Sequence, residues 1–224
     1  MSVHTEVYQK ILQEVRSGNA NLIAVSKTKP IADIQELYQL GHRDFGENYV
    51  QELVDKQPHL PPDIKWHFIG HLQSNKVKYI ASFVYMIHGV ESLKLLREIN
   101  KQAQKHHRVI KCLLQLHVAK EDTKFGMNLD ELMELLQAYL LEKDSFQHVS
   151  ICGLMAMASF TDDQQQVRSE CKEVKHIFDK VLSEKGSDLA EFNQISMGMS
   201  GDYPIALSEG STLVRVGSLI FGNR

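Results

Sequence analysis

The stretch NLIAVSKTKP, residues 21 to 30, contains the first strand–helix junction of the chain. The run from Leu22 to Ser26 is mainly apolar, which predicts a short buried strand. Pro30 suits the first turn of a helix that follows. Lys27 comes directly after the strand, although buried ammonium groups are costly and lysine is nearly absent from cores unless it is paired. The position of Lys27 therefore calls for an explanation.

The same strand-then-helix pattern repeats along the chain. An amphipathic helix at the N-terminus, with Val3, Val7, Ile11 and Val15 at four-residue spacing, precedes the first strand. We expect eight strands, at 22–26, 43–47, 65–70, 83–90, 109–118, 149–158, 191–197 and 212–217. We expect helices between them at 31–40, 48–57, 72–81, 92–105, 129–142, 162–184 and near 203–209, with a last short segment at 218–222.

Eight alternating units indicate an α/β fold with a parallel sheet. In a chain of 224 residues, eight units predict a single closed (β/α)8 TIM barrel with an extra N-terminal helix, close to the lower size limit of that fold. An open doubly wound sheet is the main alternative. No low-complexity segment or long linker marks a second domain, so we expect one domain over residues 1–224.

Composition and charge exclude several classes of protein. The chain is 43% hydrophobic and 24% charged with a formal charge of −3, so it has no broad basic field for nucleic acid. No apolar run reaches the roughly 18 residues that span a bilayer, and the first helix is too polar for a signal peptide. We expect a cytoplasmic protein. The three cysteines and the scattered histidines lack the spacing of a metal site, so we expect no metal. We expect the cysteine side chains to pack as small hydrophobic groups.

Lys27 acquires a chemical role if the barrel forms. Because the carboxyl ends of barrel strands form one mouth where sites are built, Lys27 is expected at that mouth. A lysine removed from water has a lowered pKa and becomes a nucleophilic amine, which forms Schiff bases with carbonyl compounds. The alternative is a lysine that has left the barrel and is simply solvated.

The last two strand ends predict an anion site beside Lys27. SMGMSGDYP follows the seventh strand, and Gly217 and Ser218 follow the eighth. Phosphate sites made by the loops after strands seven and eight recur in these barrels, and exposed backbone N–H groups suit anions. Because strand eight adjoins strand one when the barrel closes, a carbonyl compound carrying a phosphate satisfies both sites.

Other polar residues near strand ends have two interpretations each. Arg215, in an otherwise apolar strand, forms a structural ion pair or points its guanidinium at the ligand. Asn48, with Glu47, is a helix N-terminus or a ligand contact. His71 caps the next helix or touches ligand, and His67 is read as a packed strand residue. The segment KFGM after the fifth strand is a lid or a support loop.

Six stretches together resemble a known family. AVSKTKP, FGENYVQE, WHFIGHLQSNK, KFGM, GLMAM and SMGMSGDYPIALSEGSTLVRVGSLIFG, from about residue 22 to the C-terminus, are similar to the YggS/PROSC family of pyridoxal-phosphate-binding homeostasis proteins. The resemblance implies a single barrel like the N-terminal domain of alanine racemases. It departs from the family in a shorter first helix and link, and in MAMASF, which lacks a proline common in relatives.

The resemblance also implies a site and a role. Lys27 carries pyridoxal 5'-phosphate as an internal aldimine. Ser200, Gly217 and Ser218 surround its phosphate, Arg215 faces its pyridine nitrogen, and Asn48 and Ser196 are secondary contacts. An arginine there disfavours protonation of the ring nitrogen and weakens the ring as an electron sink. The implied role is control of free pyridoxal phosphate and of amino- and keto-acid balance, with no catalytic residue. PLP-dependent apoenzymes or free amino acids are the implied partners, and we expect a monomer.

Two other functions compete with this one. An amino-acid racemase needs a group on each face of the aldimine. Lys27 supplies one, and the resembling racemases take the other from a second domain, which this sequence does not show after Arg224. A Schiff-base aldolase acting on phosphosugars needs no cofactor, and a coloured protein would exclude it.

Overall fold

The described residues, 3–119 and 125–222, form a closed barrel of eight parallel strands in the computed structural model. The strands follow one another around the ring in chain order, and β8 pairs with β1 to close it. This confirms the predicted TIM barrel rather than an open sheet. The strands are β1 (Asn21–Val25), β2 (Asp44–Glu47), β3 (Lys65–Phe68), β4 (Met86–Val90), β5 (Ile110–Leu116), β6 (Val149–Ala156), β7 (Gln194–Ser196) and β8 (Leu213–Val216).

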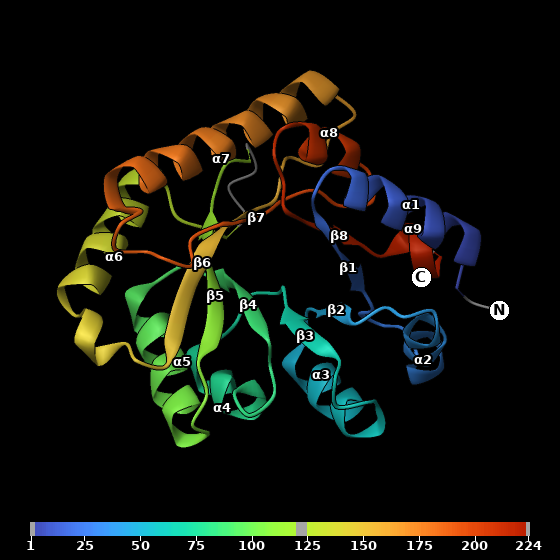
Figure 1. Ribbon diagram of the computed structural model, residues 1–224, viewed down its shortest axis with the longest axis horizontal. Helices are drawn as coiled ribbons and strands as arrows, with labels where there is room; N and C mark the ends of the chain where they lie inside the picture. The colour runs from blue at the N-terminus through green and yellow to red at the C-terminus, as the bar shows by residue number, and fades with distance from the viewer. Residues whose placement is uncertain (1–2, 120–124, 223–224) are drawn as a thin grey trace.

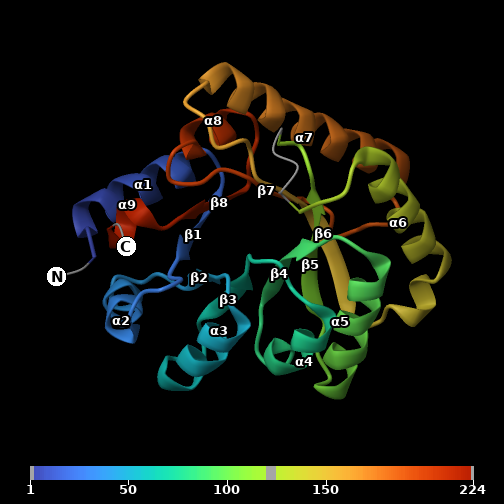
Figure 2. The same cartoon turned by 180° about the vertical axis from the view of Figure 1, so that it is seen from behind.

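Helices surround the barrel on its outside, as Figure 1 and the view from behind in Figure 2 show. The α-helices are α1 (Thr5–Ser17), α2 (Ile31–Gln39), α3 (Val50–Lys56), α4 (Val77–Ile80), α5 (Leu93–Lys105), α6 (Leu129–Leu141), α7 (Gln164–Lys185), α8 (Tyr203–Ser208) and α9 (Ser218–Phe221). Short 3-10 helices cover Gln57–His59, Ser74–Lys76 and Lys143–Ser145. The His4 N–H donates to the Ile220 carbonyl at 2.8 Å, which joins the start of α1 to α9. The first and last helices, α1 and α9, therefore lie side by side (Figures 1 and 2).

Several strands are shorter than the apolar runs that predicted them. The run from Phe83 was expected to start the fourth strand, but β4 begins at Met86. The N–H groups of Phe83 and Val84 instead donate to Ile80, closing the turn after α4. In KFGM, Lys124 lies outside the described residues. Met127 pairs with Leu116 at the end of β5, so the described part of that segment supports the carboxyl end of this strand.

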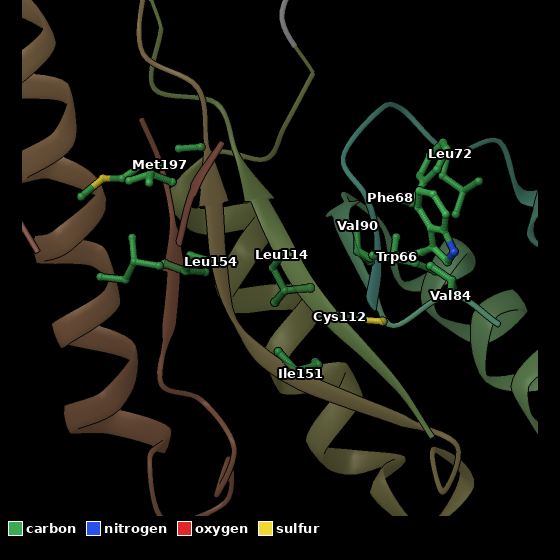
Figure 3. Packing of buried hydrophobic residues seen from close by; sticks show 14 of the residues in the cluster. Trp66, Phe68, Leu72, Val84, Val90, Cys112, Leu114, Ile151, Leu154 and Met197 are labelled. Atoms are coloured by element: carbon green, nitrogen blue, oxygen red, sulfur yellow. The ribbon is translucent and has the colours of Figure 1, made fainter. Parts of the chain in front are cut away.

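The hydrophobic core has two layers because successive strand residues face opposite sides of the sheet. The larger layer lies between the strands and the helices. Leu114 of β5 and its register partner Leu154 of β6 belong to it (Figure 3). A smaller apolar cluster forms a group of its own and consists of Ile23, Met86, Leu113, Cys152, Met155 and Leu213. The strands also carry buried polar residues, such as Ser196 of β7 and Arg215 of β8, near the candidate site described below.

The cysteines behave as the sequence predicted. Cys112, Cys152 and Cys171 are free and buried, and burial raises the pKa of each thiol. Among the described residues, no helix is both long and apolar enough to cross a membrane.

Candidate functional site

A cavity of about 640 Å³ opens at the carboxyl ends of the barrel strands. Its walls come from the loops after β1, β2, β3, β6, β7 and β8. Of the predicted site residues, the lining includes Lys27, Asn48, Ser200, Arg215, Gly217 and Ser218. Residues nearly 200 positions apart in sequence thus meet in one place, because β8 pairs with β1.

The two neighbours of Lys27 are both held by hydrogen bonds. The Ser26 hydroxyl donates to Glu47 Oε1 at 2.7 Å, and the Thr28 N–H donates to Glu52 Oε1 at 2.5 Å. Thr28 has a φ of 63°, a left-handed conformation that is uncommon for a β-branched residue and persists only where its surroundings impose it. The backbone that carries Lys27 is therefore fixed on both sides.

Lys56 joins these bonds into one buried cluster. Its ammonium donates to the Ser26 carbonyl and to Glu47 Oε1, both at 2.8 Å, and to Glu52 Oε1 at 2.6 Å. Glu47 is fully buried, and burial raises the pKa of its carboxyl while the Lys56 charge opposes that rise. Glu47 is absent from the cavity lining, so its contacts are those of a support for the Lys27 loop rather than of a ligand residue.

Asn48 differs from its neighbour Glu47 because it does line the cavity. Its Oδ1 atom is buried and finds no hydrogen-bond partner among the described residues. Buried polar atoms in native proteins normally have partners. A ligand in the cavity with a hydrogen-bond donor would supply the missing partner. The Asn48 oxygen therefore indicates that the cavity suits a ligand with a donor group at this point.

The loops after β7 and β8 are joined to each other and pressed against β1. The Gly217 N–H lies 3.3 Å from the Ser200 hydroxyl, and the Arg215 N–H donates to the Gly198 carbonyl at 3.0 Å. A Cβ added at Gly217 would lie 3.0 Å from the Val25 carbonyl oxygen. Only glycine allows this close approach without a shift. Ser200 and Ser218 from the same two loops both line the cavity.

Arg215 is a buried cation at the cavity. Its guanidinium donates to Ser196 Oγ at 2.5 Å and to the Ala156 carbonyl at 2.9 Å. Burial lowers the pKa of Arg215 to about 10, while the charge of Asp202 opposes the decrease. The side chain stays charged at neutral pH, and the described residues give it no ion pair. The structural ion pair of the first interpretation is thus not seen among the described residues, and Arg215 is one of the residues that line the cavity.

Ser196 does not line the cavity but lies fully buried against Arg215. Its hydroxyl is also 3.0 Å from His88 Nδ1. Sequence reasoning missed His88 altogether and placed Ser196 as a ligand contact. His88 is the single polar side chain of the apolar strand β4 (Met86–Val90), and that pattern was the available signal.

His71 lies outside the cavity lining. Its Nδ1 atom is 3.2 Å from Glu91 Oε1, and its ring stacks on Phe125 with centroids 4.0 Å apart. The helical turn that follows, starting at Ser74, receives no side-chain cap. In the described residues, no group of three His, Cys, Asp or Glu side chains could hold a metal ion.

The donor set fits a phosphorylated aldehyde with a ring acceptor. Lys27 offers an amine, Ser200 and Ser218 offer hydroxyls, and Arg215 offers a fixed cation at the wall. The close approach at Gly217 and the orphan oxygen of Asn48 agree with a ligand seated among them. The fold and mouth define a class, a (β/α)8 barrel with a lysine after β1 and serine–glycine loops after β7 and β8.

Comparisons with known proteins agree with that class. The family model for the alanine racemase N-terminal domain matches residues 6–224. The pyridoxal phosphate homeostasis protein of Aquifex aeolicus is 37% identical over 98% of this chain and 94% of its own length. The chain belongs to the family of the pyridoxal phosphate homeostasis proteins, as its sequence motifs predicted.

Solved structures give the same result. PipY of Synechococcus elongatus, solved with PLP bound, is 34% identical with a TM-score of 0.82 over 95% of this chain and 99% of that one. An alanine racemase of Clostridium difficile has a TM-score of 0.72 at 11% identity, which shows the fold alone. This chain covers 58% of that racemase.

Proposed function

We propose that this protein binds pyridoxal 5'-phosphate at Lys27 and takes part in the homeostasis of that cofactor and in amino- and keto-acid balance. The observation that carries the proposal is the single cavity in which Lys27, held by hydrogen bonds of its flanking residues, meets the Ser200 and Gly217 loops. The name of the Aquifex relative and the PLP-bound PipY structure support it.

Each residue has a proposed part. Lys27 supplies the amine that bonds to the cofactor's aldehyde, while Ser200, Ser218 and the Gly217 backbone hold its phosphate. Arg215 faces the ring nitrogen, and Asn48 contacts the ligand beside it. The cofactor supplies an electrophilic aldehyde and, in enzymes, an electron sink. Because the guanidinium stays charged, it opposes a proton on the ring nitrogen, and the site is better suited to holding than to carbanion chemistry.

We propose holding and release rather than turnover. Among the described residues that line the cavity there is no histidine, tyrosine or cysteine. Besides Lys27, the ionisable groups there are Lys29, Asp162, Asp202 and Arg215. The Lys29 ammonium donates to the carbonyls of Phe221, the last residue of α9, and of Gly222. Asp202 Oδ1 accepts from the Met199 N–H. The alternative, an amino-acid racemase, would need a second base among them.

The proposed partners follow from the chemistry of release. An open mouth admits free amino acids, whose amines compete with Lys27 for the aldehyde, and PLP-dependent apoenzymes would receive the cofactor. We propose a monomer that acts in the cytoplasm. Light scattering during size-exclusion chromatography should give a mass near 25.6 kDa, and a doubled mass would contradict the monomer.

Borohydride labelling tests the attachment. The purified chain is loaded with pyridoxal phosphate, reduced and digested, and the labelled peptide is sequenced. We expect a visible absorbance band and a label on Lys27, with both lost in Lys27→Ala. Lys29→Ala is the matched control two residues away and should keep the label. A label on Lys29 would overturn the assignment of Lys27 as the attachment site. A colourless protein would favour the alternative function, a Schiff-base aldolase without a cofactor.

A further inference from the structure

A row of polar side chains, buried except for the last one, runs from Arg215 into the barrel. Beyond Ser196 and His88, the His88 Nε2 atom lies 2.9 Å from His67 Nδ1. The other ring nitrogen of His67 lies 3.1 Å from Asp44 Oδ1. Five side chains are therefore linked by four consecutive contacts, whose donor–acceptor distances lie between 2.5 and 3.1 Å. We call this set, Arg215–Ser196–His88–His67–Asp44, the polar row.

The polar row crosses the barrel interior. Ser196 belongs to β7 and His88 to β4, which are not neighbours in the sheet, so their contact spans the inside of the barrel. His67 and His88 are 1% and 0% exposed. Asp44 is the first residue of β2 and thus lies at the opposite end of the barrel from the cavity. The row joins the cavity wall to the far rim.

The donors and acceptors along the row can be assigned in one direction. Arginine only donates and an ionised carboxylate only accepts, which fixes both ends. Burial lowers the pKa of His88 well below its usual value, so this ring is neutral and carries one N–H. If Ser196 accepts from Arg215, its own hydroxyl donates to His88 Nδ1, and the His88 proton then lies on Nε2.

The remaining contacts follow from that assignment. His88 Nε2–H donates to His67 Nδ1, and His67 Nε2–H donates to Asp44. Every proton in the row then has an acceptor, as buried polar groups require. With His88 reversed, Ser196 Oγ would accept from both Arg215 and His88, and the Ser196 proton would have no acceptor among the described residues.

The row is suited to holding a position rather than to moving protons. A proton conduit ending at the cavity would require Arg215 to release a proton. With a pKa of about 10, the guanidinium keeps its proton at neutral pH. Its second nitrogen is also engaged by the Ala156 carbonyl. The row therefore limits the orientations of Arg215.

We infer that His88 is a positioning residue of the cofactor site, with His67 and Asp44 fixing the ring proton that makes His88 an acceptor for Ser196. Ser196 in turn holds Arg215 toward the ring nitrogen of the cofactor. The inference about the cofactor rests on the proposed function, whereas the proton assignment concerns the chain alone. Two experiments keep these parts separate.

The first experiment reads the ring protons in the cofactor-free chain. Histidine is labelled with 15N, and long-range 1H–15N spectra give the tautomer of each ring, with His88→Asn and His67→Asn variants assigning the signals. We expect the proton on Nε2 in both His67 and His88 at neutral pH. A proton on Nδ1 of either ring would reverse the row and overturn the inference, whatever the cofactor does.

The second experiment measures recognition of the ring nitrogen. Binding of pyridoxal phosphate is compared with that of its deaza analogue, in which carbon replaces the ring nitrogen. In the wild-type chain the affinity ratio should be roughly tenfold or more, the change expected for a hydrogen bond from a charged group. In His88→Leu the ratio should fall toward one while binding of the analogue is unchanged. His88→Asn, whose amide oxygen can accept from Ser196, should restore part of the ratio.

The outcomes separate the two proposals. Equal weakening of both ligands in His88→Leu would indicate loss of structure alone and overturn the positioning role. If His88→Leu fails to fold, Ser196→Ala removes the same contact to Arg215 with a smaller change and should also lower the ratio; an unchanged ratio there overturns the inference. Failure of the wild-type chain to bind either ligand would contradict the proposed function, while the tautomer experiment would still stand.

Discussion

At the scale of single residues, the position of Lys27 is set by the hydrogen bonds of the residues on either side of it. The Ser26 and Thr28 contacts to Glu47 and Glu52 fix the backbone on both sides. The sequence predicted the place of Lys27, because a strand end in a barrel specifies it. It could not predict the Lys56 cluster, because that depends on the distance between a β1 loop and α3, which periodicity does not encode.

The loops after β7 and β8, which we propose hold the phosphate, give a prediction at this scale. Ser200→Ala with Ser218→Ala removes two hydroxyls from the cavity wall but leaves the backbone donors. A hydrogen bond to a charged group contributes about 1.5–3 kcal/mol, so the double variant should retain pyridoxal phosphate at least roughly tenfold less tightly. Dialysis followed by absorbance measures retention, and circular dichroism controls for folding. Retention equal to wild type would place the phosphate elsewhere.

The Lys56 cluster gives a prediction about stability. Lys56→Met leaves the Glu47 carboxylate buried without its cation, which typically costs about 3–5 kcal/mol in the free energy of unfolding. Adding Glu47→Gln removes the unpaired charge and should recover part of that loss. Urea unfolding of the two single variants and the double variant measures the coupling. If the double variant is no more stable than Lys56→Met, the ion pair is not what the cluster contributes.

At the scale of elements, His42 connects α1 to the barrel. It precedes β2, its Nε2 atom is 2.8 Å from the Asp44 carbonyl oxygen, and its Nδ1 atom is 3.3 Å from the Tyr8 hydroxyl of α1. Its ring also meets Tyr8 and Phe45 edge-on. A buried neutral histidine thus holds the first helix against the second strand.

This contact predicts sensitivity to acid. Burial lowers the pKa of His42 to about 4 from 6.5. The unfolded chain therefore binds the proton more readily, and stability falls as pH drops from about 6.5 to about 4. Across that window the loss should be about 3 kcal/mol. His42→Gln has no titrating ring, so the gap between its unfolding free energy and that of wild type should change by about this amount between pH 7 and 4. A constant gap would contradict the prediction.

Element boundaries show where sequence patterns stop being informative. The apolar run ending at Val90 predicted a strand from Phe83, yet Phe83 and Val84 complete the turn after α4. Similarly, β7 covers only Gln194–Ser196 of the expected strand 191–197, although the Asn193 N–H still donates to the Cys152 carbonyl of β6. Hydrophobicity predicts that a segment is buried. Tertiary hydrogen bonds decide which of its residues pair in the sheet.

At the scale of the whole molecule, ring closure brings the site together. Pairing of β8 with β1 brings Arg215 beside Ile23 in register, and hence the last loops beside Lys27. The strand count alone was enough to predict this from sequence. The polar row was not predicted, because its residues are spread over β2, β3, β4, β7 and β8. Only the curvature of the closed barrel turns those five strands toward one another.

The same whole-molecule view predicts the absence of turnover. Racemisation needs a proton taken from one face of the substrate carbon and returned on the other. In the proposed site Lys27 serves one face only, and for the other face the described cavity lining offers the carboxylates of Asp162 and Asp202 but no histidine, tyrosine or cysteine. A missing general base typically removes 10²–10⁴-fold in rate, and in the proposed site a charged Arg215 at the ring nitrogen would lower the rate further. We therefore expect alanine to displace cofactor from Lys27 slowly, without racemisation.

Solvent deuterium exchange at the alanine α-carbon, followed by NMR over hours, measures this directly. A known alanine racemase at the same concentration is the positive control, and Lys27→Ala is the negative one. We expect the wild-type signal to stay with the negative control while the absorbance band declines as cofactor is released. Exchange near the rate of the racemase, lost in Lys27→Ala, would mean that the Asp162 or Asp202 carboxylate completes a catalytic pair and that the chain is an enzyme.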